Sequence, residues 1–246
     1  MKVRRYLGLV GIAALSVLGG CSEEPRGTSG QLGTLRFEYS TAGACAGCAI
    51  DREVLAGSQL DIDVFNMNLK TDYGVRSTAP DVAEFAATTR CRFAGEDDCR
   101  DGISVSTKTA GDADLEVFDE WTGTVLDRVT IKVREASTLE ASVRVKAPQG
   151  RFPTDVKPTA DGVFEVKVGS DVEIAVAAVR SGSGASLIAT SAAIQSAYAD
   201  ERVVGPRPAF HGAAPTEYAK AKSPGVASVA LVGAGAREEL RFRVVR

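Results

Sequence analysis

The fold of this chain is indicated by the segment Ala56-Gly57-Ser58-Gln59-Leu60-Asp61-Ile62-Asp63-Val64. It joins a glycine turn to a stretch with apolar residues at every second position, which is the period of a β-strand. Val168-Gly169-Ser170-Asp171-Val172-Glu173-Ile174-Ala175-Val176 has the same pattern 112 residues later. Alternation with one polar face is typical of half-buried antiparallel strands. The two segments therefore predict an all-β chain in which one structural unit occurs twice.

Other segments repeat in the same order along the chain. Gly111–Val117 matches Gly225–Leu231, and Val129–Val133 matches Leu240–Val244. Two copies of about 110 residues, each with several short strands, fit two tandem antiparallel β-sandwiches. We place these domains at residues 35–136 and 137–246. Further alternating strands are expected at Phe37–Tyr39, Val143–Val145 and Phe164–Val168, and Ala189–Arg202 is expected to be irregular or to form one or two helical turns.

The first copy resembles the group 2 type of bacterial Ig-like domains. The resemblance rests on Gly57-Ser58, on Val75-Arg76-Ser77-Thr78-Ala79-Pro80-Asp81-Val82-Ala83-Glu84-Phe85 and on Gly111–Asp119. It covers Val54–Arg134 and is weaker over residues 163–246, where Ala199–Val204 lacks the expected proline. The resemblance implies two Ig-like sandwiches and no particular activity.

The N-terminus indicates export. Three basic residues precede the uncharged run Leu7–Leu18, which is too short for a membrane span of about 20 residues. Leu18-Gly19-Gly20-Cys21 resembles the lipobox of bacterial lipoproteins, which implies removal of residues 1–20 and lipidation of Cys21. An ordinary secretory signal is the alternative. Residues 21–34 then form a polar, flexible tether. Ser22 in place of aspartate after the lipidated cysteine favours the outer membrane over the inner one in a Gram-negative host.

The chain has five cysteines, and lipidation of Cys21 leaves four that can pair in an oxidising compartment. Three connectivities are possible, and clustering in the sequence favours Cys45–Cys48 and Cys91–Cys99. Cys45 and Cys48 have the spacing of a redox C-x-x-C, but a strand follows them instead of the helix whose N-terminus would lower a thiol pKa. A zinc site would need a second close pair, which Cys91 and Cys99 do not form. We interpret both pairs as structural bonds.

Other candidates for chemistry have simpler interpretations. His211 is the only histidine, so a Ser-His-Asp triad or a histidine metal motif has at most one possible centre. No serine stands in a G-x-S-x-G elbow, and we interpret His211 as an exposed loop residue without a role. Gly233 and Gly235 fit a hairpin turn better than a nucleotide loop. Trp121 is either an exposed contact residue or a cover for a sandwich edge. Five acidic residues could hold calcium but are expected on solvated strand faces and a turn: Asp112, Asp114, Asp119, Glu120 and Asp127.

The charge of the chain limits its partners. The net charge is −3 and becomes about −6 without residues 1–20, which argues against nucleic acid. We predict a non-catalytic, membrane-anchored lipoprotein of the bacterial envelope with a binding, adhesion or structural role and no cofactor. Its partner would be a protein or a glycan, contacted through the loops Ala86–Gly102 and Val204–Pro215. The alternative is an envelope thiol-redox or metal-binding protein that uses Cys45 and Cys48.

Overall fold

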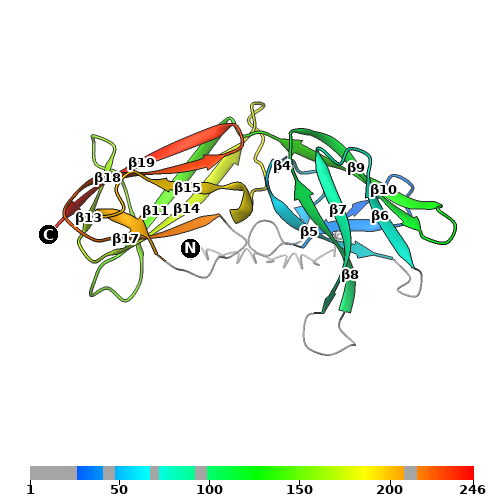
Figure 1. Ribbon diagram of the computed structural model, residues 1–246, viewed down its shortest axis with the longest axis horizontal. Helices are drawn as coiled ribbons and strands as arrows, with labels where there is room; N and C mark the ends of the chain where they lie inside the picture. The colour runs from blue at the N-terminus through cyan, green and yellow to red at the C-terminus, as the bar shows by residue number, and fades with distance from the viewer. Residues whose placement is uncertain (1–26, 41–47, 67–71, 92–98, 208–214) are drawn as a thin grey trace, which may run out of the picture.

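A computed structural model describes residues 27–40, 48–66, 72–91, 99–207 and 215–246, with only the backbone for 89–91 and 99–101. In these residues the chain is all-β and forms two sandwiches that follow one another along the long axis of the molecule (Figure 1). Within the same ranges, no helix has the length and apolar character needed to cross a membrane.

The first sandwich consists of two sheets. One sheet has the strand order β1 (Thr28–Ser29), β2 (Arg36–Tyr39), β5 (Gln59–Phe65), β8 (Cys99–Thr107), β7 (Ala83–Cys91), with β3 (Cys48–Ala49) also on β2. The other has the order β4 (Val54–Leu55), β10 (Val125–Arg134), β9 (Gly111–Asp119), β6 (Tyr73–Ser77). Lettering β2 and β5 to β10 in chain order as A to G gives the sheets A-B-E-D and G-F-C. This is the arrangement of an Ig-like sandwich.

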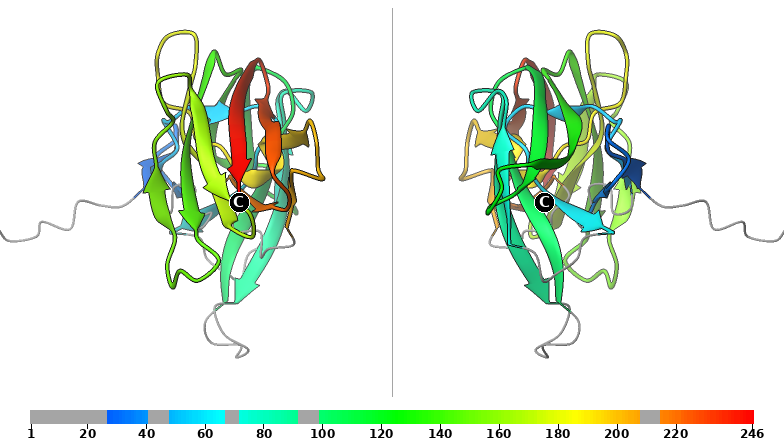
Figure 2. Two further views of the ribbon diagram at one scale, coloured as in Figure 1. Left: turned by 90° about the vertical axis from the view of Figure 1, so that its left-hand side faces the viewer. Right: turned by 90° about the vertical axis from the view of Figure 1, so that its right-hand side faces the viewer.

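The second sandwich repeats this arrangement. One sheet has the order β12 (Thr154–Val156), β11 (Thr138–Lys146), β14 (Asp171–Arg180), β17 (Thr216–Ala221), β16 (Val204–Pro206). The other has the order β13 (Val163–Lys167), β19 (Ala236–Val245), β18 (Gly225–Gly233), β15 (Gln195–Tyr198). Lettering β11 and β14 to β19 as A to G again gives A-B-E-D and G-F-C. Views along the long axis show the strands of each domain as two facing layers (Figure 2).

The repeat extends to single backbone contacts. Gly57 and Gly169 have φ angles of 86° and 82°, in the left-handed region that glycine adopts without a Cβ clash. The Gly57 amide donates to the Thr107 carbonyl at 3.1 Å, and the Gly169 amide donates to the Ala221 carbonyl at 2.8 Å. The same turn therefore precedes the B strand in both domains, which confirms the expected repeat.

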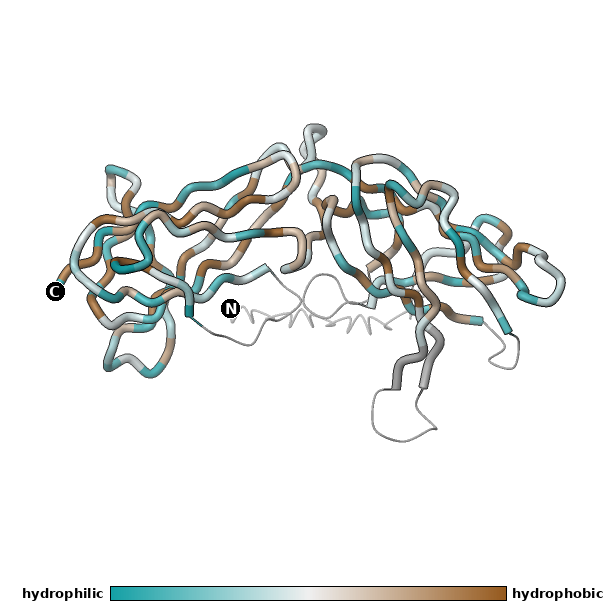
Figure 3. Tube along the Cα trace, viewed as in Figure 1, coloured by the Kyte–Doolittle hydropathy of each residue, from teal (hydrophilic) through white to brown (hydrophobic). Residues whose placement is uncertain are grey.

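Strand alternation builds one core inside each sandwich. In β5 the side chains of Leu60, Ile62 and Val64 are buried, while the residues between them face outward. The hydropathy colours alternate along many strands in the same way (Figure 3). In the second core Phe164 and Phe242 pack with their ring centroids 5.6 Å apart. Burying each such side chain contributes about 1.5–3 kcal/mol to stability.

A segment of the second domain also completes the first one. Ile188 forms a parallel bridge with Val54, and its side chain, 3% exposed, belongs to the core of the first sandwich. The Leu55 amide donates to the Ile188 carbonyl at 2.8 Å, and the Ile188 amide donates to the Glu53 carbonyl at 2.9 Å. Leu187, the preceding residue, packs in a separate apolar cluster at the junction. These contacts hold the two domains together.

The structure corrects three expectations. The folded part begins before the predicted end of the tether, because Thr28–Ser29 pairs with β2. Ala86–Gly102 is not a long loop, since most of it belongs to the paired strands β7 and β8. Ala189–Arg202 contains a short 3-10 helix, η2 (Ser191–Ala193), and the whole of strand β15.

Candidate functional site

A carboxylate occupies a core-facing position of the second sandwich. In β17 the side chains of Ala219 and Ala221 are fully buried, and Glu217 shares their face because side chains alternate along a strand. The residue opposite Glu217 in the sheet is Ile174, which is also fully buried. Glu217 therefore points into the space between the two sheets, where the pattern of the strand would place an apolar residue.

The facing strand β15 supplies polar partners. Ser196 and Tyr198 stand opposite the buried Leu231 and Val229, so both turn toward the same space. The Tyr198 hydroxyl donates to Glu217 Oε1 at 2.5 Å. Burial raises the pKa of Tyr198 well above its usual range, and the hydrogen bond to Glu217 adds to this effect. The phenol is thus protonated and is the donor of this bond.

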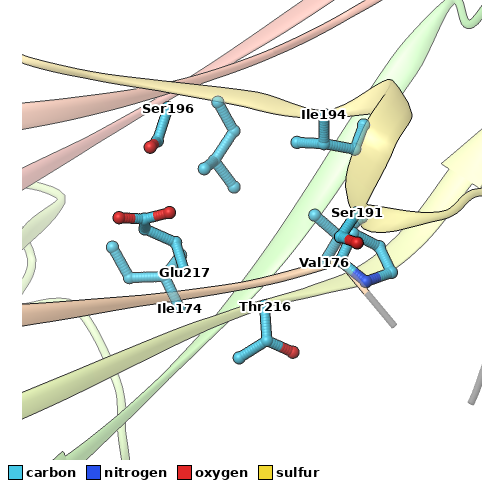
Figure 4. Close-up of a pocket in the computed structure, with 9 residues that line it drawn as sticks. Ile174, Val176, Ser191, Ile194, Ser196, Thr216 and Glu217 are labelled. Carbon is cyan, nitrogen blue, oxygen red and sulfur yellow. The ribbon is translucent and has the colours of Figure 1, made fainter. Parts of the chain in front are cut away.

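Glu217 and Ser196 line a pocket of about 100 Å³ between the sheets. Figure 4 shows the Glu217 carboxylate and the Ser196 hydroxyl directed into the same space. The lining is partly apolar and partly polar and comprises Ile174, Val176, Ser191, Ile194, Ser196, Pro215, Thr216, Glu217 and Leu231. In the part of the chain that the structure describes, no Lys or Arg forms an ion pair with Glu217. We call this site the Glu217 pocket.

The turn between β9 and β10 carries the most exposed large apolar side chain of the described residues. Trp121 is 84% exposed, and its indole N–H donates to Asp72 Oδ2 at 3.1 Å. Asp119 Oδ1 accepts the amides of Thr122 at 2.8 Å and Trp121 at 2.9 Å, and these bonds, with that of Thr122 first, lower the pKa of Asp119. The turn lies at the end of the molecule far from the C-terminus (Figure 1). Trp121 is therefore an exposed residue and not the cover of a sandwich edge.

The structure describes only some of the cysteines and not the single histidine. Cys21, Cys45 and His211 lie outside the described residues. Cys48 begins β3, and its sulfur accepts a hydrogen bond from Arg52 Nη1 at 3.3 Å. Cys91 and Cys99 are directly opposite each other in the ladder of β7 and β8.

The acidic residues do not form a common cation site. Asp127 is fully buried, which corrects the expectation of a solvated position. Its carboxylate accepts the amides of Leu32, Thr34 and Leu35, each at 2.8 Å, and thereby holds the segment before β2. Asp112 pairs with Arg134 at 2.6 Å. Over the described ranges, no group of three or more His, Cys, Asp or Glu side chains is arranged to hold a metal ion.

The glycines near the C-terminus form a hairpin turn. Gly233 and Ala236 close the ladder between β18 and β19, and Gly235 has a φ angle of 87°. A tight turn of this kind favours glycine at the left-handed position. The interpretation of this segment as a hairpin is confirmed.

Comparisons with known proteins give structural likenesses alone. No family model matches the chain, and no curated protein matches it. Domains 4 and 5 of the S-layer protein SbsC are 12% identical with a TM-score of 0.29, covering 85% of this chain and 99% of that chain. The Escherichia coli adhesin FdeC is 9% identical with a TM-score of 0.31, covering 89% of this chain and 65% of that one. Likenesses at this level carry no argument about function.

The class of this protein follows from its own strand order. The chain is an all-β protein with two tandem Ig-like sandwiches, as the two sheets A-B-E-D and G-F-C of each domain define.

Proposed function

We propose that this chain is a non-catalytic lipoprotein of the bacterial envelope that is anchored through Cys21 and binds a partner. The sequence Leu18-Gly19-Gly20-Cys21 supports the anchor. Only six residues separate Cys21 from Thr28, where the first strand begins. A flexible chain of this length spans about 13 Å, so the first sandwich would stay close to the membrane.

The exposure of Trp121 carries the binding role. The Trp121 side chain is 84% exposed, so a partner that covers it would remove a large apolar surface from water. Its indole and backbone are already held by Asp72 and Asp119, so little conformational freedom is lost on binding. Tryptophan is also enriched among the residues that dominate binding energy at protein interfaces. We therefore assign the β9–β10 turn as the contact surface for an envelope protein.

The cysteines support a structural role over a redox role. We propose the disulfides Cys45–Cys48 and Cys91–Cys99. Support for the first comes from the surroundings of Cys48, which begins β3 and is followed by the short strand β4 instead of a helix whose N-terminus would activate a thiol. Support for the second comes from the register, because directly opposite residues of an antiparallel pair have Cα atoms about 4.5–5.5 Å apart, within the range that a disulfide spans.

Site-specific photo-crosslinking in intact cells tests the binding role. A photoreactive phenylalanine derivative replaces Trp121 in one variant and Phe152 in the other. Phe152 is the matched control, because it is 76% exposed and lies in the second domain between β11 and β12. We expect position 121 to give a discrete adduct with one envelope protein and position 152 to give none.

Two results would count against the proposal. Equal adduct patterns from both positions would show only that exposed aromatic residues meet neighbours at random. A lack of adducts at position 121, with the protein present in the envelope, would remove Trp121 as a contact residue. Both variants change exposed side chains, so their folding should be unaffected.

A further inference from the structure

The Glu217 pocket is a second candidate for binding, and it lies in the other domain from Trp121. Its polar groups stand on the inner faces of the two sheets, where Glu217 is half-buried and Ser196 is exposed, so the pocket is open to solvent. Ala219 and Ala221 continue the row of Glu217, and Val229 and Leu231 oppose the row of Tyr198 and Ser196. Carboxylates on core-facing rows are rare because burial disfavours the charged form.

Among the described residues, only one of the two oxygens of the Glu217 carboxylate accepts a hydrogen bond. Glu217 Oε1 accepts the Tyr198 hydroxyl, while no described residue donates to Oε2. An ionised carboxylate offers about four acceptor sites on its two oxygens. The remaining acceptors of Glu217 and the hydroxyl of Ser196 point into the pocket (Figure 4).

We propose that the Glu217 pocket binds a primary ammonium group on a short aliphatic stem. The positive charge would meet Glu217 Oε2, and the Ser196 hydroxyl would accept a second ammonium N–H. Ile174, Val176 and Leu231 would contact the methylene groups of the stem. This inference does not depend on the lipid anchor or on Trp121.

The size of the pocket favours an ammonium over a guanidinium. A volume of about 100 Å³ holds about three water molecules, which is room for a nitrogen and two methylene groups. A guanidinium has five donors in a rigid plane, and the lining offers too few acceptors on one side to meet them. The same ammonium chemistry occurs in a lysine side chain of a protein and in a free alkylamine.

Titration of the purified, ¹⁵N-labelled protein with n-butylammonium chloride tests the inference by NMR. Sodium chloride at the same ionic strength is the reference. We expect saturable shifts at residues of β15 and β17 with millimolar affinity, because one charge-assisted contact in a small pocket supports little more. A peptide with a single lysine and blocked termini distinguishes the two sources: binding of the peptide indicates a lysine of a partner protein, and binding of the amine alone indicates a free alkylamine.

Variants of pocket residues distinguish binding in the Glu217 pocket from a general attraction between the ammonium ion and the negatively charged surface. Glu217→Gln keeps the shape and an acceptor for Tyr198 but removes the charge, and should weaken binding about tenfold. Glu165→Gln removes an equal charge from an exposed position of β13 and should change nothing. Ser196→Leu should fill the pocket and abolish the shifts while the charge remains. Linear, non-saturating shifts in the wild type, or equal affinities in wild type and Glu217→Gln, would overturn the inference.

Discussion

Ile188 of the second domain is paired with Val54 of the first, and its side chain is buried in the core of the first sandwich. A second contact lies beside this pair, where Thr190 Oγ1 accepts the Gln59 amide at 3.1 Å. Two domains that only touched at a linker would be free to move relative to each other. The segment around Ile188 replaces that freedom with backbone pairing and a buried apolar contact.

The first prediction concerns this shared core. Ile188→Ala should destabilise the first sandwich by about 2–4 kcal/mol, although the residue belongs to the chain of the second, because the substitution leaves a cavity in the first core. Hydrogen exchange by mass spectrometry should show faster exchange in peptides that contain β4 and β5.

Val226→Ala is the matched control for Ile188→Ala. Val226 is 58% exposed in β18, so its truncation should change stability by no more than about 0.5 kcal/mol. If Ile188→Ala speeds exchange only in the second domain, the two cores are independent, and Ile188 does not stabilise the first sandwich.

The second prediction concerns Asp127 and pH. Burial by itself would raise the pKa of Asp127, but the amides of Leu35, Leu32 and Arg128 outweigh it and hold the pKa below its usual value. A carboxyl with a lowered pKa stabilises the fold above its unfolded pKa of about 4, and this contribution is lost as the pH falls through the folded pKa. Asp127→Asn should cost about 1–3 kcal/mol at pH 7, and less below about pH 4.

Urea unfolding at pH 7 and pH 3 measures this difference. Asp155→Asn serves as the control, because the Asp155 side chain is 87% exposed and the substitution should be nearly neutral at both pH values. A cost of Asp127→Asn that does not change between the two pH values would contradict the role given to the carboxylate.

The sequence predicts the strands better than it predicts the site. The alternation in Gln59–Phe65 and Asp171–Arg180 depends on residues close together in the chain, so the sequence indicates both strands and the repeat. Asp127 looked like an exposed acidic residue, because the amides that bury it come from residues 32–35, far away in the sequence. Glu217 gave one signal that could have been used, since it shares the parity of Ala219 and Ala221.

The third prediction concerns the cysteines. In exported protein Cys45, Cys48, Cys91 and Cys99 should resist alkylation until they are reduced, as peptide mass spectrometry can establish. The Cys91–Cys99 bond closes a ring of nine residues, so its loss in the Cys91→Ser/Cys99→Ser variant should cost about 2–3 kcal/mol. Cys45→Ser/Cys48→Ser should lower the melting temperature only modestly, because its ring is shorter. A thiol–disulfide exchange activity that disappears in this second variant would favour the redox alternative.

Membrane fractionation and the mass of the N-terminal peptide test whether Cys21 carries a lipid anchor. Wild-type protein should remain with the membrane fraction in high salt and enter solution only with detergent, because each buried CH₂ of an acyl chain contributes about 0.8 kcal/mol and two or more chains hold firmly. The mass of the N-terminal peptide should show cleavage before Cys21 and an added lipid, and Cys21→Ser should abolish both. Wild-type protein that washes off membranes in salt, with an unmodified Cys21, would show that this chain is not a lipid-anchored protein.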